Sequence, residues 1–149
     1  MSRNVHRPHE LQRRLDRGRH ATCVTNDDRP FDEAALRSAE RELAAALASD
    51  EPTAWVYHYT EDAVFDAGGE HAVEGRQALL EMARSMRPLS DVSIRPLRTA
   101  GHEDLAAVWT EASWASGDPS DRQMVHVRGI LVWHRDSDGR WRVAMEHIG

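Results

Sequence analysis

Residues 122–148 read RQMVHVRGILVWHRDSDGRWRVAMEHI. Two segments in which apolar and polar residues alternate flank the turn-forming tetrapeptide Asp136-Ser137-Asp138-Gly139. Alternation with a period of two is typical of β-strands, and an Asp-Gly turn between two such segments predicts a β-hairpin. We expect the hairpin to cover 122–135 and 140–148, with Arg135 paired to Arg140.

Two further extended segments, 91–99 and 104–115, precede this hairpin and complete an antiparallel meander. N-terminal to them the apolar residues recur at helical spacing, which predicts three helices. These helices are expected at about 32–49, with Asp32 as the cap, at 53–60, and from Leu79 to just before Pro88. Two short strands, 63–66 and 71–74, lie between the second and third helices. Helices followed by a long antiparallel sheet predict an α+β fold with helices on one face.

Length and composition exclude several classes of protein. The chain has 149 residues, enough for one domain, and no apolar run approaches the ~18 residues of a membrane span. The net charge of −6 argues against nucleic-acid binding, and the absence of lysine excludes Schiff-base chemistry. No apolar segment at the N-terminus fits a secretory signal, and Cys23 has no disulfide partner. We expect a cytoplasmic protein with no membrane partner.

The charge is divided unevenly along the chain. Residues 1–30 hold 7 Arg and 4 acids (net +3), while residues 31–149 hold 12 Arg and 21 acids (net −9). We expect a flexible arginine-rich arm over 1–30 and one folded domain over 31–149. The arm contains His6, His9, His20 and Cys23, whose spacing superficially resembles a zinc site. Because structural zinc sites usually contain more thiolates, we favour a solvated arm and predict no metal.

The expected strand register assigns side chains to the two faces of the sheet. A six-residue loop over 116–121 would place Glu111 opposite His126 and Trp109 opposite Arg128. One face is then apolar with a compact polar group at one end, as in small-molecule pockets. Its members are Leu105, Ala107, Trp109, Glu111, Met124, His126, Arg128, Ile130, Val132, Val143, Met145 and His147. The opposite face is also apolar, so we expect helices to cover one face and a second copy of the chain to cover the other, in a homodimer.

The polar group on the first face supplies the candidate catalytic residues. A carboxylate at Glu111 could orient the His126 imidazole and raise its pKa toward neutrality for acid/base work, or the two could form a purely structural pair. An inward Arg128 would need Glu111 or an anionic or carbonyl-bearing substrate as its partner. Six large side chains could line the cavity as substrate-binding residues or simply form core: Trp55, Tyr59, Met82, Met86, Trp109 and Met145.

Three stretches resemble a known superfamily: YTEDAVF at 59–65, VEGRQAL at 73–79 and DGRWRVAMEH at 138–147. Over about residues 32–149 the chain is similar to the nuclear transport factor 2-like superfamily, in its SnoaL-like and ketosteroid-isomerase-like branches. The resemblance implies a cone-shaped α+β barrel, in which a curved, mostly antiparallel sheet and about three N-terminal helices enclose a pocket. It also implies a frequent dimer, and members that include isomerases, cyclases, dehydratases and non-catalytic binding modules.

Only one catalytic position of the steroid-isomerase branch has a matching residue in this sequence. Asp66 falls where that branch places its catalytic base, if one residue is deleted before it, and His147 falls where a pocket or rim histidine is frequent. The two tyrosines of that site correspond to about Leu43 and Ala83, which offer no hydroxyl. A dienolate would therefore lack its hydrogen bonds, and we do not expect steroid isomerisation.

Two functions remain open from the sequence. The first is a small-molecule enzyme that uses general acid/base chemistry without a cofactor, as a cyclase, isomerase or dehydratase, through Asp66, Glu111, His126, Arg128 and His147. Glycine-rich nucleotide loops, nucleophile elbows and HExxH motifs are absent from the sequence. The alternative is a non-catalytic ligand-binding or dimerisation module of the same fold.

Overall fold

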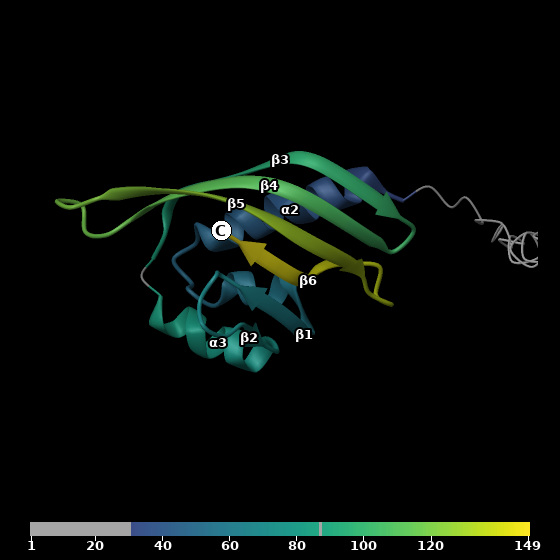
Figure 1. The fold of residues 1–149 in the computed structure, drawn as a ribbon, viewed down its shortest axis with the longest axis horizontal. Coiled ribbons are helices and arrows are strands. Elements are labelled where there is room, and N and C mark those ends of the chain that lie inside the picture. The colour runs from purple at the N-terminus through teal and green to yellow at the C-terminus, as the bar shows by residue number, and fades with distance from the viewer. Residues whose placement is uncertain (1–30, 87) are drawn as a thin grey trace, which may run out of the picture.

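Two α-helices, one 3-10 helix and six strands make up residues 31–86 and 88–149, the part of the chain that the computed structural model describes (Figure 1). In chain order they are α2 (Glu33–Leu47), the 3-10 helix η2 (Ala54–His58), β1 (Tyr59–Asp66), β2 (Val73–Glu74), α3 (Arg76–Ser85), β3 (Ser90–His102), β4 (Leu105–Ser116), β5 (Gln123–Arg135) and β6 (Trp141–Ile148). The predicted α+β class is confirmed. The second of the three predicted helices is a 3-10 helix of only five residues.

The strands form one sheet in the order β2-β1-β6-β5-β4-β3. Only β1 and β6 run parallel, because the chain crosses from one side of the sheet to the other between them. The edge strands β2 and β3 do not pair with each other, so the sheet is curved but open, and the predicted closed barrel is wrong. The two-residue β2 is too short to carry the sheet around to β3.

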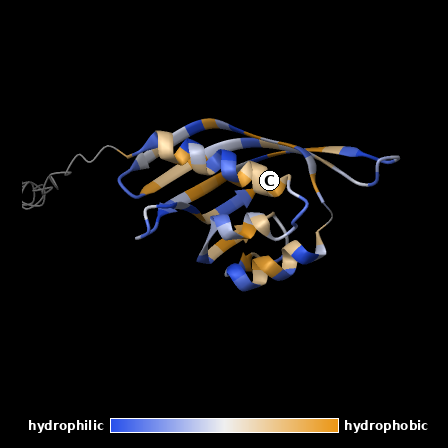
Figure 2. Cartoon of the chain, turned by 180° about the vertical axis from the view of Figure 1, so that it is seen from behind, coloured by the Kyte–Doolittle hydropathy of each residue, from blue (hydrophilic) through white to orange (hydrophobic). Residues whose placement is uncertain are grey.

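Both α-helices follow from local sequence signals. The Asp32 side chain accepts a hydrogen bond from Ala35 N (2.9 Å) and thereby caps α2, as predicted. Helix α3 begins at Arg76, three residues earlier than expected, directly after Gly75, whose φ of 84° suits glycine. In Figure 2, α2 lies in front of the sheet and crosses the long strands. The core between the helices and the sheet includes Leu36, Leu43, Leu79, Val108, Trp133 and Val143, all at most 1% exposed.

The helices cover the face of β4 and β5 opposite to the predicted one. On the covered face lie Ala106, Val108 and Thr110, which are almost fully buried. Their short side chains allow the helices to approach the sheet closely. The uncovered face, called the outer face below, carries large side chains that are between 47% and 55% exposed: Leu105, Trp109, Met124, Ile130 and Met145. Since both faces are apolar in sequence, hydropathy alone could not distinguish them.

The register between β4 and β5 differs from the prediction by two residues. The loop covers 117–122, because Ser116 pairs with Gln123, and it begins at Gly117 with a φ of 107°. Glu111 therefore lies opposite Arg128, and His126 lies opposite Ser113. The predicted Glu111–His126 pair is not formed. The parity of the register was right, so Glu111, His126 and Arg128 still share one face.

A β-bulge in β6 separates the two halves of that strand. Trp133 pairs with Val143, whereas the preceding residue of β5, Val132, pairs with Met145, which leaves Ala144 as an extra residue. N-terminal to the bulge, Val143 points into the core. Beyond the bulge the alternation is reversed, so residues 146 and 148 face inward while 145 and 147 face outward. The prediction that Val143, Met145 and His147 share a face is therefore wrong.

None of the described helices is long and apolar enough to cross a membrane. The predicted arm, with its histidines and Cys23, lies outside the described residues. The arm and the cytoplasmic location stay predictions.

Candidate functional site

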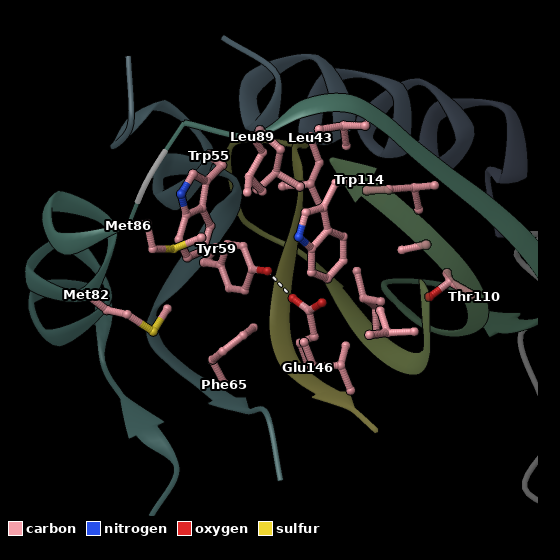
Figure 3. Close-up of a pocket in the computed structure, with 17 residues that line it drawn as sticks. Leu43, Trp55, Tyr59, Phe65, Met82, Met86, Leu89, Thr110, Trp114 and Glu146 are labelled. Carbon is pink, nitrogen blue, oxygen red and sulfur yellow. Dashed lines mark hydrogen bonds between the residues drawn. The ribbon is translucent and has the colours of Figure 1, made fainter. Parts of the chain in front are cut away.

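A small cavity lies between the inner face of the sheet and the helices α2, η2 and α3 (Figure 3). Its volume is about 110 Å³. The lining is almost entirely apolar, with Leu43, Trp55, Phe65, Met82, Met86, Trp114, Leu131 and Ile148 among its members. Three residues bring carboxyl or hydroxyl groups to it: Tyr59, Thr110 and Glu146. An apolar cavity with a few polar groups is the usual form of a small-molecule site.

The parallel pairing of β1 with β6 places the polar groups of these two strands together. Tyr59 begins β1 directly after the 3-10 helix and lies beside Val143, while Phe65 at the other end of β1 lies beside Glu146. Because the bulge reverses the alternation in β6, Glu146 points inward toward Tyr59. The local irregularity of β6 therefore places a carboxyl group in the cavity.

Tyr59 and Glu146 form a hydrogen bond inside the cavity. The Tyr59 hydroxyl donates to Glu146 Oε2, as the dashed line in Figure 3 shows. Tyr59 is only 2% exposed, and burial, together with the nearby Glu146 carboxylate, raises the pKa of its phenol well above the ordinary value of 10. The phenol is therefore a permanent donor at neutral pH.

Glu146 is the one acidic side chain of the cavity lining in the described part of the chain. Burial raises the pKa of Glu146 to about 6, while the hydrogen bond from Tyr59 acts in the opposite direction and favours the carboxylate. The side chain is half-buried, so it combines a desolvated carboxyl group with some surface open to the cavity. A carboxyl group that changes protonation near neutrality can both take and return a proton.

The predicted substrate-binding residues divide into two groups. The cavity lining contains four of them: Trp55, Tyr59, Met82 and Met86. The rings of Trp55 and Tyr59 contact each other edge to face, and their centroids lie 5.3 Å apart. Trp109 and Met145 lie on the outer face instead, with exposed side chains. Their predicted inward placement fails because the helices cover the other face of β4 and because of the bulge in β6.

Glu111 and Arg128 belong to an ion-pair row on the outer face. Arg95 donates to Glu111 from one side, and Arg128 Nη2 lies 3.3 Å from Glu111 Oε1 on the other. The hydrogen bond from Arg95 is the main reason that the pKa of Glu111 is lowered. His126 is exposed on the same face. None of these residues lines the cavity, so the structure does not bring the predicted catalytic group to it.

Asp66 and His147 also meet outside the cavity. Asp66 Oδ2 lies 3.1 Å from His147 Nδ1, where the ends of β1 and β6 run side by side. The backbone N–H of Gly68 bonds the other oxygen of Asp66, and this bond is the main cause of the lowered pKa of Asp66. The two predicted residues thus form an exposed hydrogen-bonded pair with each other.

Glu146, the acid of the cavity, is not among the residues predicted from the sequence. The only signal for it was the position of a carboxylate between apolar residues near the end of the last strand. Regular alternation turns that position outward and favours His147, because a bulge has no reliable sequence signature when it contains no glycine.

The fold and the cavity define a class of protein. It is an α+β fold in which helices pack on an open, curved sheet and enclose a small apolar pocket that contains one acid. The chain belongs to the SnoaL-like domain family, whose model matches residues 40–144. The resemblance that the sequence indicated is thereby confirmed. A comparison with curated proteins finds no match.

Solved structures share this fold at low sequence identity. A ketosteroid isomerase-like protein from Erwinia carotovora atroseptica is 18% identical, with a TM-score of 0.67, over 77% of this chain and 92% of that one. A conserved protein from Planctomyces limnophilus is 17% identical, with a TM-score of 0.69, over 79% and 96% of the two chains. A Catenulispora acidiphila protein in complex with S-DNPA is 16% identical, with a TM-score of 0.64, over 78% and 90%.

Proposed function

We propose that this protein is an enzyme that moves a proton between carbon atoms of a small substrate, without a cofactor, and that Glu146 carries the proton. The observation that carries this proposal is the Glu146 carboxyl group, which lies in an apolar cavity with its pKa raised to about 6. Burial of this kind is how enzymes bring a carboxyl pKa close to neutrality for acid/base work.

The proton transfer begins with the Glu146 carboxylate. It removes a proton from the carbon next to a substrate carbonyl group, and the electron pair of that C–H bond moves toward the carbonyl oxygen to give an enolate. The resulting carboxylic acid then returns the proton to the same carbon or to a conjugated one, which restores the carboxylate. Tyr59 keeps Glu146 oriented through its hydrogen bond. Return to the same carbon exchanges the proton, and return to a conjugated carbon makes the net reaction an isomerisation.

The relatives support this proposal at the level of class. The Erwinia protein is described as ketosteroid isomerase-like, and the Catenulispora protein is described in complex with S-DNPA. A steroid is too large for the cavity in this chain, because a cavity of about 150 Å³ holds benzene and this one measures about 110 Å³. We therefore propose isomerase-type chemistry on a much smaller compound.

A binding module without catalysis is the second candidate. The hydrogen bond between Tyr59 and Glu146 favours it, since these two polar groups already satisfy each other. In that case the cavity would hold a ligand without any proton transfer.

The exchange of α-protons in cyclopentanone tests the proposal. In D2O near neutral pH, proton NMR follows deuterium incorporation with the wild-type protein and with Glu146→Gln. We expect the wild type to accelerate exchange over buffer, and Glu146→Gln to lose about 100-fold or more of that acceleration. Glu81→Gln, which alters an exposed glutamate of α3, is the matched control. If cyclopentanone binds but its α-protons do not exchange faster, the result contradicts catalysis and favours the binding module. If cyclopentanone does not bind, the result contradicts both candidates.

We also propose a homodimer through the outer face. On this face the exposed Trp109 lies opposite the exposed Ile130, and the half-buried Val132 lies opposite the exposed Met145, in adjacent rows of one sheet. A large apolar patch on a sheet favours association with a second copy. The ion-pair row of Arg95, Glu111 and Arg128 borders this patch and provides a polar rim.

A further inference from the structure

The indole nitrogen of Trp114 is an unused hydrogen-bond donor in the cavity. Trp114 lies on β4 and lines the cavity together with Tyr59 and Glu146. Figure 3 shows the nitrogen edge of its ring turned toward the Tyr59–Glu146 pair. No residue in the described ranges 31–86 and 88–149 accepts a hydrogen bond from this nitrogen.

The other unpaired indoles of the sheet differ from Trp114 in one respect. The Nε1 atoms of Trp133 and Trp141 also lack partners among the described residues, but they are fully buried in the core where no ligand can reach them. The Trp114 nitrogen is not among the sealed atoms of the described residues, and its side chain is only half-buried. A ligand in the cavity can therefore contact it.

The remaining hydroxyl donors of the cavity are already engaged. Tyr59 donates its proton to Glu146, and Thr110 Oγ1 lies 3.5 Å from the Gly129 carbonyl oxygen, to which it donates. An indole N–H only donates and cannot accept, so its partner must be a lone pair on the ligand. An oxygen placed there pairs a donor that otherwise has no partner within the described protein.

We propose that Trp114 Nε1–H binds the carbonyl oxygen of the substrate, and that the site selects small neutral carbonyl compounds with an apolar body. This inference rests on the proposed function, because it places the oxygen of the reacting carbonyl beside the proton carrier. The hydrogen bond strengthens as negative charge develops on that oxygen, so Trp114 also favours the enolate.

The charge of the cavity excludes anionic substrates. No arginine lines the cavity in the described part of the chain, and a carboxylate ligand would meet the Glu146 carboxylate in an apolar environment. Arg128, which the sequence analysis considered as a partner for an anionic substrate, lies on the outer face. A neutral carbonyl group satisfies Trp114 without placing a second negative charge beside Glu146.

The volume of the cavity sets the size of the ligand. At about 110 Å³ it is smaller than the cavity of about 150 Å³ that holds benzene. We therefore expect a reacting part of about five or six non-hydrogen atoms. Cyclopentanone has this size, and methylenecyclopentane matches its shape but has no oxygen.

An NMR titration of the ¹⁵N-labelled protein tests the donor directly. The protein has five tryptophans, and sequential assignment together with the Trp114→Phe variant identifies the Trp114 indole signal. We expect cyclopentanone to move this signal downfield and methylenecyclopentane to leave its hydrogen-bond shift unchanged. Trp114→Phe should weaken cyclopentanone binding about three- to tenfold and leave methylenecyclopentane binding within about twofold. Tyr57→Phe, at an exposed aromatic side chain of η2 that lies outside the cavity and the outer face, is the control.

Two results would overturn the inference: equal effects of the ketone and the hydrocarbon on the wild-type indole signal, or unchanged ketone affinity in a folded Trp114→Phe. The first comparison uses only the wild-type protein, so it stands even if the variant does not fold. Butyrate near pH 8 should not compete with cyclopentanone, and competition would contradict the selection of neutral ligands. Faster proton exchange without the indole shift would refute the role of Trp114 and leave the proposed catalysis standing. The indole shift without exchange would refute the proposed catalysis and leave Trp114 as a binding residue.

Discussion

Tyr59 donates a hydrogen bond to Glu146 although 87 positions separate the two residues in the chain. The contact exists because β1 and β6 pair in parallel within an otherwise antiparallel sheet. It joins a phenol that stays protonated to a carboxyl group that titrates near neutrality. The pair therefore gives the cavity a measurable dependence on pH.

Replacement of Glu146 by Gln is expected to stabilise the folded protein at neutral pH. The pKa of Glu146 is about 6 in the folded state against an ordinary value of 4.5, so folding favours the protonated form. Its stabilising contribution is present below about pH 4.5 and is lost as the pH rises through about 6. The difference between the two pKa values corresponds to about 2 kcal/mol. Urea unfolding of both proteins from about pH 4 to about pH 8 measures it.

Glu111→Gln provides the control for that experiment, because the pKa of Glu111 is shifted in the opposite direction. Arg95 lowers it, so the contribution of Glu111 is present at neutral pH and is lost as the pH falls. The two variants should therefore differ from the wild type with opposite dependence on pH. A Glu146→Gln curve parallel to that of the wild type would show that the carboxyl group is not buried.

Replacement of Tyr59 by Phe is expected to raise the pH at which proton exchange becomes fast. In the wild type the rate should increase with pH around an apparent pKa of about 6, because the carboxylate is the active base. The hydrogen bond from Tyr59 lowers the pKa of Glu146, so its removal should move the midpoint upward. The pH–rate profile of cyclopentanone exchange measures the shift. Tyr57→Phe, at an exposed tyrosine of η2, should leave the midpoint in place, and a downward shift in Tyr59→Phe would contradict the assignment.

Trp109→Glu on the outer face is expected to convert the proposed homodimer to a monomer. A carboxylate at the centre of a buried apolar interface would be desolvated without a partner, which costs several kcal/mol. Size-exclusion chromatography with light scattering compares the two masses. Tyr57→Glu changes an apolar side chain of similar exposure outside the sheet and should leave the mass unchanged. A monomeric wild type at about 100 μM would refute the proposed interface.

Gly129→Ala is expected to destabilise the protein at the position where Gly129 of β5 pairs with Ile148 of β6. A Cβ atom at Gly129 would lie 2.5 Å from the backbone oxygen of His147 and 2.7 Å from Ile148 Cγ2. The strands must separate to admit it, at a cost of about 1–3 kcal/mol. Thermal unfolding checks this value. Gly69→Ala is the control, because nothing lies within 4 Å of a Cβ atom there.

The fold could be predicted from sequence because each signal for it is local. Asp32 caps a helix, and the turn that ends at Gly139 joins two alternating strands. These signals survive small errors in register, so the fold class and the family did not depend on exact pairing. Trp55 and Met82 were expected in the cavity lining on the same basis, from their places in helical segments.

The site could not be predicted because it depends on choices that are not local. Whether Thr110 or Trp109 points inward depends on which face of the sheet α2 covers, and both faces are apolar enough to be covered. Whether Glu146 or His147 points inward depends on a single extra residue in β6. The identity of the acid in the cavity therefore required the three-dimensional arrangement.

Because of the bulge at Ala144, the number of residues in β6 determines which side chains face the cavity. The segment from Val143 to Ile148 can line the cavity in two ways. With the bulge, Glu146 and Ile148 face the cavity. With regular pairing, the thioether of Met145 and the imidazole of His147 would face it instead. Insertion or deletion of one residue in β6, compensated by gain or loss of the bulge, could exchange an acid for an imidazole base without any substitution. In this segment, alignment gaps would thus be as informative about chemistry as residue identities.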